Sequence, residues 1–568
     1  MSTDAPQSPR PTKVKYLRWL ALAASLFVAW FCWQLFGPNP PIIISKDTTY
    51  ITAPLLPNGL PDYEKYVLDK YREGVTPENN AAVLLLQALG PGDLEPSEFP
   101  AVCSEIGLAP VPPAADAMEP LDEADNRQRI SNWLGDFGQT DSDRDRADEV
   151  IREAVDHPWS SDTVPPLAAW IHRNERSLDL IVRASERPRY YLPSPTLLNG
   201  TTEILIAMLL PNVQSMRDAA RALLVRAMWH LGENRPVDAW RDLRASHRLA
   251  RLMAQGPTLV EQFVAIGTDE MQVDGTVALL DDHRLTADEA RQILSDLAAR
   301  SNSSSVATSL DQFERWSFLD VILLTKKDGA GGLLEIHDVK PHNLAVKLLN
   351  RVSIDWNLVL REGNQWYDRM SAAARISDGS ARRKALDQFD SNIGQPAQQL
   401  RQPGQWIAGA MSRQKRSELV ATSLAAWFIS DNSAAIKFED RANTHLELLR
   451  LAATLAVYRA EHGQYPDKLE DLVPTILPQL PVDLYHAKPF VYKRDAEGYL
   501  LYSTGENGID DGGSNEQYRN GILAGRELDW NDDPTAEKLR KQIPAGADDL
   551  SIRVPRPAFK LPSPSAKR

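Results

Sequence analysis

The sequence predicts a mainly α-helical protein with an N-terminal transmembrane helix, an irregular helical exterior region and a small C-terminal α+β module. Three observations predict this class. An apolar run lies near the N-terminus, glycine and proline punctuate helical patterns through the middle of the chain, and a long apolar helix precedes two strand patterns near the C-terminus. With 568 residues, the chain exceeds one typical core, so we expect more than one folding unit.

Composition excludes some classes of protein. The net charge is −14, with 77 acidic against 63 basic residues, and no long basic stripe is present. Phosphate binding needs a concentrated basic surface, so we expect no nucleic-acid partner. The two cysteines are Cys32, which lies inside the apolar run, and Cys103. A disulfide framework is therefore excluded.

The first element is a transmembrane anchor at residues 16–36, preceded by a cytoplasmic tail at residues 1–15. The apolar run from Trp19 to Phe36 is about as long as the hydrocarbon core requires, and Gly37 with Pro38 ends it. Four basic residues precede the run: Arg10, Lys13, Lys15 and Arg18. This charge bias predicts an inner-membrane protein with a cytoplasmic N-terminus and a periplasmic bulk. A cleaved signal peptide is the alternative, but no small-x-small cleavage site follows the run.

Residues 37–165 read as a proline-rich adaptor with short helices at 64–72 and 80–89, and residues 166–430 as a helical region. In that region helices are expected to stop at Gly232 and before Gly256, and Thr286 with Glu289 forms a capping box. Further helical patterns cover residues 306–324, 345–361 and 364–374. The aromatic residues on these patterns are predicted core anchors: Trp316, Trp356, Trp366 and Tyr367.

Enzyme signatures are weak. Residues Ser412–Lys415 and Ser430–Asn432 match two of three elements of serine penicillin-binding enzymes, but Lys-Thr-Gly is missing and the spacing is too short. We interpret the match as coincidence. His337, Asp338 and His342 fit no zinc pattern and read as a solvated loop. The chain contains no HExxH, GxSxG or GxxxxGK[ST] motif.

The predicted module covers residues 431–533, and residues 534–568 are predicted to be a disordered tail. Leu448, Leu451, Leu455 and Tyr458 form one helical face, which Gly463 ends. Alternating patterns at 490–493 and 499–503 then predict an antiparallel hairpin.

Three segments of this module resemble the globular domain of type II secretion major pseudopilins: "YRAEHGQYPDKLEDLVP", "LPVDLYHAKPFVY" and "GYLLYSTGENGIDDGG". They follow that family's order of helix end, Tyr-Pro turn, loop, hairpin and acidic loop. As a whole, the chain resembles large uncharacterised bacterial membrane-anchored exported proteins. The resemblance implies a small α+β fold and a calcium ion in the acidic loop. A long exterior region separates anchor and module here, unlike in pseudopilins, so pilus-like polymerisation is not expected.

The acidic loop also has the chemistry of a calcium site. Calcium needs about six to eight oxygen ligands, and glycines allow backbone carbonyls to turn inward. The candidate ligands in the loop are Asn507, Asp510 and Asp511, and the resemblance to pseudopilins implies a further ligand, Asp532, in a later segment. Asn507 stands at an aspartate position of the resembling family. The alternative is a solvated turn that caps the hairpin, because Asp and Gly are the usual turn residues.

Two functions remain in competition. The first is a non-enzymatic, single-pass envelope protein with a scaffolding or secretion-related assembly role and envelope protein partners. The second is an envelope hydrolase or ligand-binding protein with a site in the helical region. The candidate carboxylates of that second site are Glu261, Asp269, Glu270, Asp281 and Asp282.

Overall fold

The structure is a computed structural model. It describes residues 13–109, 117–135, 141–200, 204–208, 210, 213–299, 305–328, 352–399, 408–409, 411–429, 432–516, 522–523, 526–527 and 544–561. The fold is mainly helical, with a small three-stranded antiparallel sheet near the C-terminus. His337, Asp338, His342 and Asp532 lie outside the described residues.

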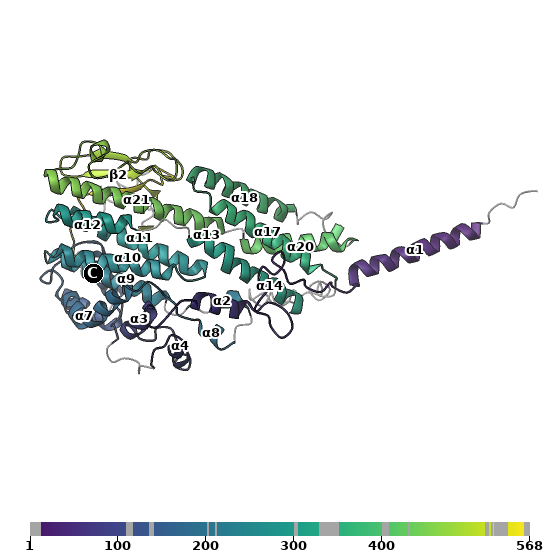
Figure 1. Ribbon diagram of the computed structural model, residues 1–568. Coiled ribbons are helices and arrows are strands. Elements are labelled where there is room, and N and C mark those ends of the chain that lie inside the picture. The colour runs from purple at the N-terminus through teal and green to yellow at the C-terminus, as the bar shows by residue number, and fades with distance from the viewer. Residues whose placement is uncertain are drawn as a thin grey trace, which may run out of the picture.

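The N-terminal apolar run forms helix α1 (Lys13–Phe36), which projects from the body of the molecule (Figure 1). Its large apolar side chains are exposed along its length. Among the residues that the structure describes, two stretches qualify as membrane spans by length and composition, Tyr16–Phe36 and Arg413–His462. The second is partly buried in the body, where Leu424 and Leu451 lie in hydrophobic cores. A core helix passes the same test, so we treat only the first stretch as a candidate anchor.

The adaptor region is built of helices that pack into the body. These are α2 (Tyr63–Arg72), α3 (Ala81–Leu89), α4 (Phe99–Glu105), α5 (Ala124–Leu134), α6 (Asp141–Asp156), α7 (Pro165–Ser185) and α8 (Pro195–Leu198). The two helices predicted here match α2 and α3 closely. Asp62 and Asn80 cap them, because each side chain accepts a hydrogen bond from a backbone amide of the first turn.

A layer of long helices fills the centre of the body (Figure 1). It contains α9 (Val213–Gly232), α10 (Pro236–Met253), α11 (Leu259–Asp281) and α12 (Ala287–Ala298). The predicted stop at Gly232 and the capping box of Thr286 with Glu289 are confirmed. Gly232 also allows close approach of the chain, because a Cβ there would lie 1.9 Å from the carbonyl oxygen of Trp159.

A second group of helices lies toward α1. It contains α13 (Ser305–Ser309), the π-helical turn η2 (Leu310–Glu314), α14 (Arg315–Asp328), α17 (Trp356–Ala374), α18 (Gly379–Gln399) and α20 (Arg413–Ile429); a 3₁₀ turn, η1 (Leu205–Ala207), packs on α14. The aromatic residues predicted as core anchors are buried here: Trp316, Trp356, Trp366 and Tyr367.

Helix boundaries in this second group differ from the prediction. The expected break between residues 361 and 364 is absent, because α17 is continuous. The expected helix start at residue 345 lies outside the described residues, and residues 353–355 are not helical. Asp355 instead caps α17 through its Oδ1, which accepts from the amides of Asn357 and Leu358.

The C-terminal module consists of α21 (Asn432–His462), the 3₁₀ turn η3 (Leu469–Leu472) and the strands β1 (Val491–Arg494), β2 (Tyr499–Ser503) and β5 (Leu550–Val554). The strand order is β1-β2-β5, and both pairings are antiparallel. A separate two-stranded pair joins β3 (Ile522–Leu523) to β4 (Arg526–Glu527). The predicted hairpin corresponds to β1 and β2. Strand β5, however, lies in the segment predicted to be a disordered tail.

One hydrophobic core crosses the boundaries drawn from the sequence. It joins residues of α3, α7, α9 to α12, α21 and the sheet. Leu451 of α21 and Ile552 of β5 are both buried in it. Because α21 packs on α11 and α12, the C-terminal module shares this core with the helical layer.

Candidate metal centre

The acidic loop follows β2, and a second acidic segment precedes β5. The antiparallel register places Ser503 opposite Leu550. The residues after β2 therefore lie beside the residues before β5. An isolated bridge between Asn515 and Asp548 extends this contact. Strand pairing thus brings together two acidic segments that are distant in sequence.

Three carboxylates meet where these segments touch. Asp511, Asp548 and Asp549 each offer one oxygen, and these oxygens lie within 4.8 Å of one another. Asp549 is fully buried, while Asp511 and Asp548 are half-buried. Like charges this close repel, so the cluster needs either protons or a cation.

Backbone amides fix one oxygen of each of two carboxylates. Asp548 Oδ2 accepts from the amides of Glu506 (2.9 Å) and Asn507 (3.0 Å). Asp549 Oδ2 accepts from the amide of Gly513 (2.7 Å). The other oxygen of each, Oδ1, is buried and has no hydrogen-bond partner of normal geometry among the described residues. Each carboxylate is therefore held firmly and retains one oxygen for a ligand.

The electrostatics of the cluster favour a bound cation. Burial, with the nearby charges of Asp511 and Asp510, raises the pKa of Asp549 to about 6, although the amides of Gly513 and Asp511 oppose this rise. Burial also raises the pKa of Asp548, with smaller contributions from Glu506 and Asp511. A divalent cation would offset both the desolvation and the repulsion.

Glycines at positive φ make room for this arrangement. Gly505 has φ +62°, and a Cβ there would lie 2.2 Å from Asp548 Oδ1. Gly508 has φ +70°, and a Cβ there would lie 2.8 Å from His486 Nε2. An L side chain at either position would be strained by its backbone and would push against the loop. Gly505 and Gly508 therefore have a steric role close to the cluster.

The predicted ligands are distributed differently from the expectation. Asp511 is in the cluster. Asn507 supports it, since its Nδ2 donates to Asp511 Oδ2 (3.3 Å) and its Oδ1 accepts from the amide of Ile509 (2.6 Å). Asp510 is not in the cluster, because its Oδ1 accepts from the Tyr502 hydroxyl (2.8 Å) and from the amide of Gly512 (2.9 Å).

The sequence analysis missed Asp548 and Asp549. They lie in the segment "GADDLSIRV", which we assigned to the tail. Its alternation of Leu550, Ile552 and Val554 is the signal of a half-buried strand, and all three side chains are buried. An acidic pair at the beginning of such a strand could have been paired with the acidic loop after β2.

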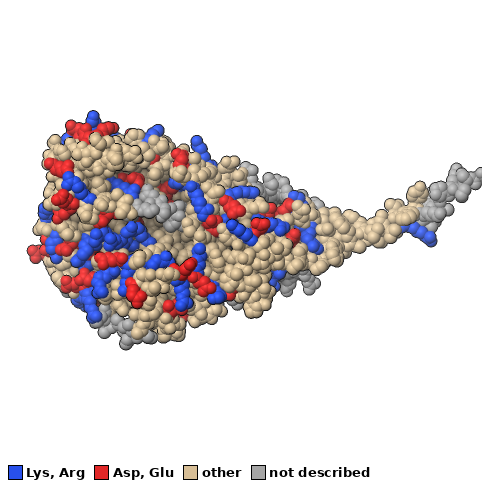
Figure 2. All heavy atoms as spheres, in the orientation of Figure 1, with Lys and Arg blue, Asp and Glu red and all other residues tan. Residues whose placement is uncertain are grey.

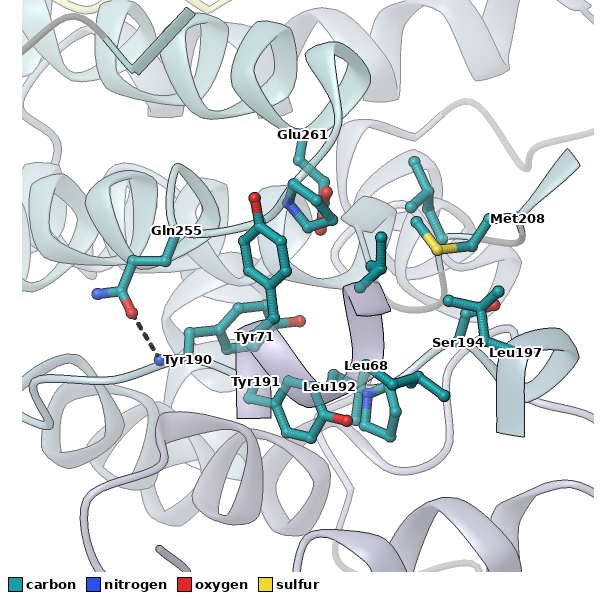
Figure 3. A pocket seen from close by; sticks show the side chains of 15 residues that line it. Leu68, Tyr71, Tyr190, Tyr191, Leu192, Ser194, Leu197, Met208, Gln255 and Glu261 are labelled. Atoms are coloured by element: carbon teal, nitrogen blue, oxygen red, sulfur yellow. Dashed lines mark hydrogen bonds between the residues drawn. The ribbon is translucent and has the colours of Figure 1, made fainter. Parts of the chain in front are cut away.

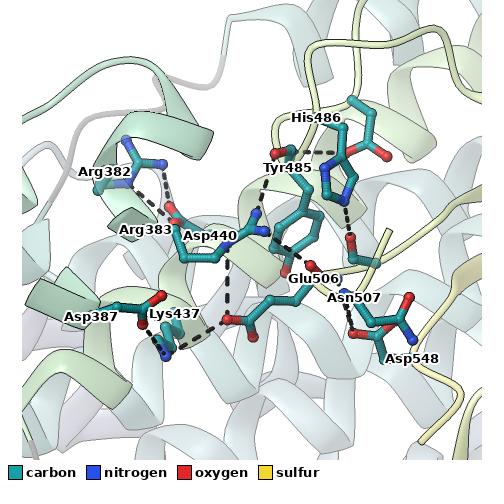
Figure 4. A network of polar contacts seen from close by, with 12 residues as sticks. Arg382, Arg383, Asp387, Lys437, Asp440, Tyr485, His486, Glu506, Asn507 and Asp548 are labelled. Atoms are coloured by element: carbon teal, nitrogen blue, oxygen red, sulfur yellow. Dashed lines mark hydrogen bonds and ion pairs between the residues drawn. The ribbon is translucent and has the colours of Figure 1, made fainter. Parts of the chain in front are cut away.

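Polar contacts connect the acidic loop to the helical body (Figure 4). Arg383 of α18 donates to the carbonyl oxygens of Glu506 (2.9 Å) and Tyr485 (3.2 Å). Lys437 of α21 lies 3.6 Å from a carboxylate oxygen of Glu506. A cavity of about 490 Å³ lies between α21 and the loop, and Asp548 forms part of its wall. The cluster is therefore coupled to two helices of the body.

The donor set fits a hard divalent cation. Carboxylate oxygens are the ligands that calcium and magnesium prefer, and calcium completes its shell with carbonyls and water. Zinc sites commonly use sulfur and imidazole ligands. Among the described residues, the cluster has neither.

The acidic residues considered for an enzyme site serve mainly as structural partners. Three of them pair with basic side chains: Asp269 with His247 (2.7 Å), Glu270 with His445 (2.8 Å) and Asp282 with Arg284 (2.7 Å). Asp281 accepts from the amide of Arg556 (2.9 Å) and lies 3.9 Å from Arg459. Glu261 belongs to a capping box with Thr258 and lines a small cavity. These contacts do not assemble a catalytic pair of carboxylates.

Comparison with protein-family models, with curated proteins and with solved structures finds no match. The resemblance to pseudopilins therefore stays a prediction from the sequence. The structure itself shows one long helix and a small antiparallel sheet in this module.

Proposed function

We propose that this chain is a non-enzymatic, single-pass protein of the bacterial inner membrane, with its N-terminus in the cytoplasm and its body in the periplasm. The observation that carries the proposal is α1. It is a helix of 24 residues whose apolar side chains stay exposed although the rest of the chain packs into cores. Such a surface is costly in water and suits a bilayer.

The distribution of charge agrees with this role. On the face in Figure 2, acidic and basic side chains intermingle over the body, whereas α1 is free of charge beyond the basic residues at its beginning. Trp30 and Trp33 are exposed near the end of α1 closest to the body, where an interfacial aromatic belt would lie.

We assign the body a scaffolding role toward other envelope proteins. Its buried charges brace the structure. Arg226 is buried and binds Asp242 (2.7 Å) and Asp179 (2.9 Å), and Arg315 binds Asp311 (2.6 Å). Arg459 donates to the carbonyl oxygens of Leu280 and Asp282. Side chains that maintain a fixed shape in this way favour a structural role.

We further propose that calcium binds Asp511, Asp548 and Asp549 and fixes the acidic loop on the body. The support is a pair of buried oxygens, Asp548 Oδ1 and Asp549 Oδ1, that have no hydrogen-bond partner of normal geometry in the described part of the chain. Because Arg383 and Lys437 connect the same loop to α18 and α21, an ordered loop would stiffen the surface between module and helices.

Membrane attachment is tested with the full chain in bacterial cells. The wild type is expected in the membrane fraction, with a reporter fused after Arg568 active outside the cytoplasm. Replacing Leu22 and Val28 with aspartate should release the chain or block its insertion, because each charge at the centre of a span costs about 2.5–3.5 kcal/mol. Val237→Asp, at an exposed apolar position of α10, is the control and should change nothing. A wild-type chain that stays soluble contradicts the proposal.

The scaffolding role is tested by crosslinking intact membranes that contain the wild-type chain. Specific partner proteins should be captured, and the same partners should be lost with the Leu22→Asp/Val28→Asp variant. A chain that is always recovered alone would contradict the assembly role while leaving membrane attachment intact.

A further inference from the structure

A small cavity lies where three groups of buried residues meet, far in sequence from the acidic loop. Its walls come from α2, from residues 190–197 and from the turn between α10 and α11 (Figure 3). Its volume is about 50 Å³, which exceeds what one water molecule needs. Val67 and Leu197 belong to the core around α14 and α17, whereas Tyr191 belongs to the cluster around α4. The cavity is therefore framed by elements whose packing fixes its shape.

Three tyrosines supply most of its aromatic surface: Tyr71, Tyr190 and Tyr191. Hydrogen bonds hold this wall in place. The amide of Tyr190 donates to Gln255 Oε1 (3.0 Å), and Gln255 Nε2 donates to the carbonyl oxygen of Pro188 (2.9 Å). Tyr191 is buried, with an exposed fraction of 7%, yet its hydroxyl has no hydrogen-bond partner among the described residues.

Glu261 is the charged residue among those described as lining the cavity. Its Oε2 accepts from the amide (3.0 Å) and the hydroxyl (2.8 Å) of Thr258. No cationic side chain of the described residues pairs with it, and burial raises its pKa to about 7. In Figure 3 the Tyr71 ring lies below Glu261, with Tyr190 beside it. The cavity thus combines an uncompensated carboxylate with the faces of aromatic rings.

We propose that this cavity binds a small organic ammonium ion. A cation would pair with Glu261 and would be attracted by the negative faces of the tyrosine rings. An anion would be repelled by the carboxylate, and an apolar neutral molecule would leave the charge of Glu261 without a counterion. The inference is independent of membrane attachment and of the calcium proposal, since none of their residues lines the cavity.

The test uses the full chain in detergent and tetramethylammonium as the probe, followed by calorimetric titration and by thermal unfolding. tert-Butanol, a neutral molecule of nearly the same size, is the comparison ligand. Tetramethylammonium should bind and raise the melting temperature by mass action, and tert-butanol should do so at least about tenfold more weakly. Equal binding of the two molecules, or no binding of tetramethylammonium at millimolar concentration, would overturn the proposal.

Two matched variants localise the site. Glu261→Gln removes the charge but keeps a capping box, because glutamine also serves at this position. Glu289→Gln makes the same change in the equivalent capping box of α12, where Glu289 likewise accepts from Thr286 and lies outside the cavity. Affinity should fall at least about tenfold in the first variant and stay unchanged in the second.

Folding of each variant is checked by its melting temperature without ligand. Should Glu261→Gln fail to fold, Tyr190→Leu gives a second test, because it removes an aromatic face and leaves the charge in place. A folded Glu261→Gln or Tyr190→Leu variant that binds tetramethylammonium as tightly as the wild type would refute the assignment.

Discussion

At the scale of single residues, Glu261 shows how burial changes an ordinary capping residue. In the equivalent position of α12, Glu289 makes the same contacts with its threonine, but those hydrogen bonds are exposed, whereas the hydrogen bonds of Glu261 are partly buried. The capping box of Glu289 is predicted from the sequence. Glu261 is predicted only as one of several acidic residues in the helical region. Its cavity is formed by α2 and by residues 190–197, which no local pattern connects to α11.

Glu261 should make stability fall with rising pH. Burial raises its pKa in the folded state to about 7, above the ordinary value of 4.5, so the folded chain binds more protons than the unfolded chain between these values. The free energy of unfolding therefore decreases through this window. Glu261→Gln should remove about 1–3 kcal/mol of that decrease.

The measurement is denaturant unfolding at about pH 5 and about pH 8 for the wild type, Glu261→Gln and Glu289→Gln. Other buried acids with raised pKa values, such as Glu64, remain in every variant, so the comparison between variants isolates Glu261. An identical pH dependence in all three proteins would contradict the prediction.

Gly505 offers a second test at this scale, because Gly512 provides a matched control. Both have positive φ, +62° and +69°, but a Cβ at Gly505 would collide with Asp548, whereas one at Gly512 meets nothing within 4 Å. Gly512→Ala should cost about 1 kcal/mol through its backbone alone. Gly505→Ala should cost about 3 kcal/mol or more, since Asp548 must also move. Thermal unfolding distinguishes them, and equal losses would show that the loop yields freely.

At the scale of elements, β5 decides what the acidic loop becomes. The helix ends at Gly232 and Gly463 and the β1–β2 hairpin follow from local signals, and the structure bears them out. The pairing of β2 with β5 does not follow from local signals, because strand pairing across a long connection depends on the whole sheet. For that reason the residues predicted from the sequence include Asp511 of the cluster but not Asp548 and Asp549, which only the pairing of β5 brings there.

Calcium should stabilise the chain through Asp549 and not through Asp510. Adding millimolar calcium to the full chain in detergent should raise the melting temperature above its value with chelator. At a calcium concentration of one hundred times the dissociation constant, the free energy of unfolding should increase by about 2.7 kcal/mol. Asp549→Asn should abolish this increase. Asp510→Asn should keep it, since Asp510 binds Tyr502 and Gly512 instead of joining the cluster.

The same experiment separates the two interpretations of the loop. If the melting temperature of the wild type is unchanged by calcium, the loop is a turn that caps the sheet. Loss of the increase in Asp510→Asn and its persistence in Asp549→Asn would favour the ligand set predicted from the sequence over the cluster in the structure.

At the scale of the whole molecule, the continuous core predicts cooperative unfolding of the adaptor, the helical layer and the C-terminal module. Leu451 is fully buried in α21 within that core. Leu451→Ala should destabilise the chain by about 2–5 kcal/mol. Hydrogen exchange should then increase together in α7 and β2, which lie on opposite sides of α21 in the sequence but share its core. The control is Val237→Ala, at an exposed position of α10.

Separate behaviour of the two regions would contradict this view. If Leu451→Ala accelerated exchange in β2 while α7 kept its protection, the module would be an independent folding unit, as the sequence boundaries suggested.

The end of α1 is fastened to the body. The amide of Ser353 donates to the carbonyl oxygen of Leu35 (2.7 Å), and Arg416 donates to the carbonyl oxygen of Gln34 (2.5 Å) and to that of Ser353 (2.9 Å). These contacts satisfy carbonyls that a helix end leaves without partners, and the guanidinium suits the negative end of the helix dipole.

A helix held by these hydrogen bonds does not rotate freely relative to the body. The body of an anchored chain would therefore keep one orientation above the bilayer. In Figure 1 the module with β2 lies at the end of the body opposite α1. The potential of anionic headgroups decays over about 8 Å at physiological salt, which is less than the diameter of one helix. With the helical layers in between, the acidic loop of an anchored chain would stand outside that ionic atmosphere and would respond to the cation concentration of the bulk compartment, not to the enriched layer at the lipid surface.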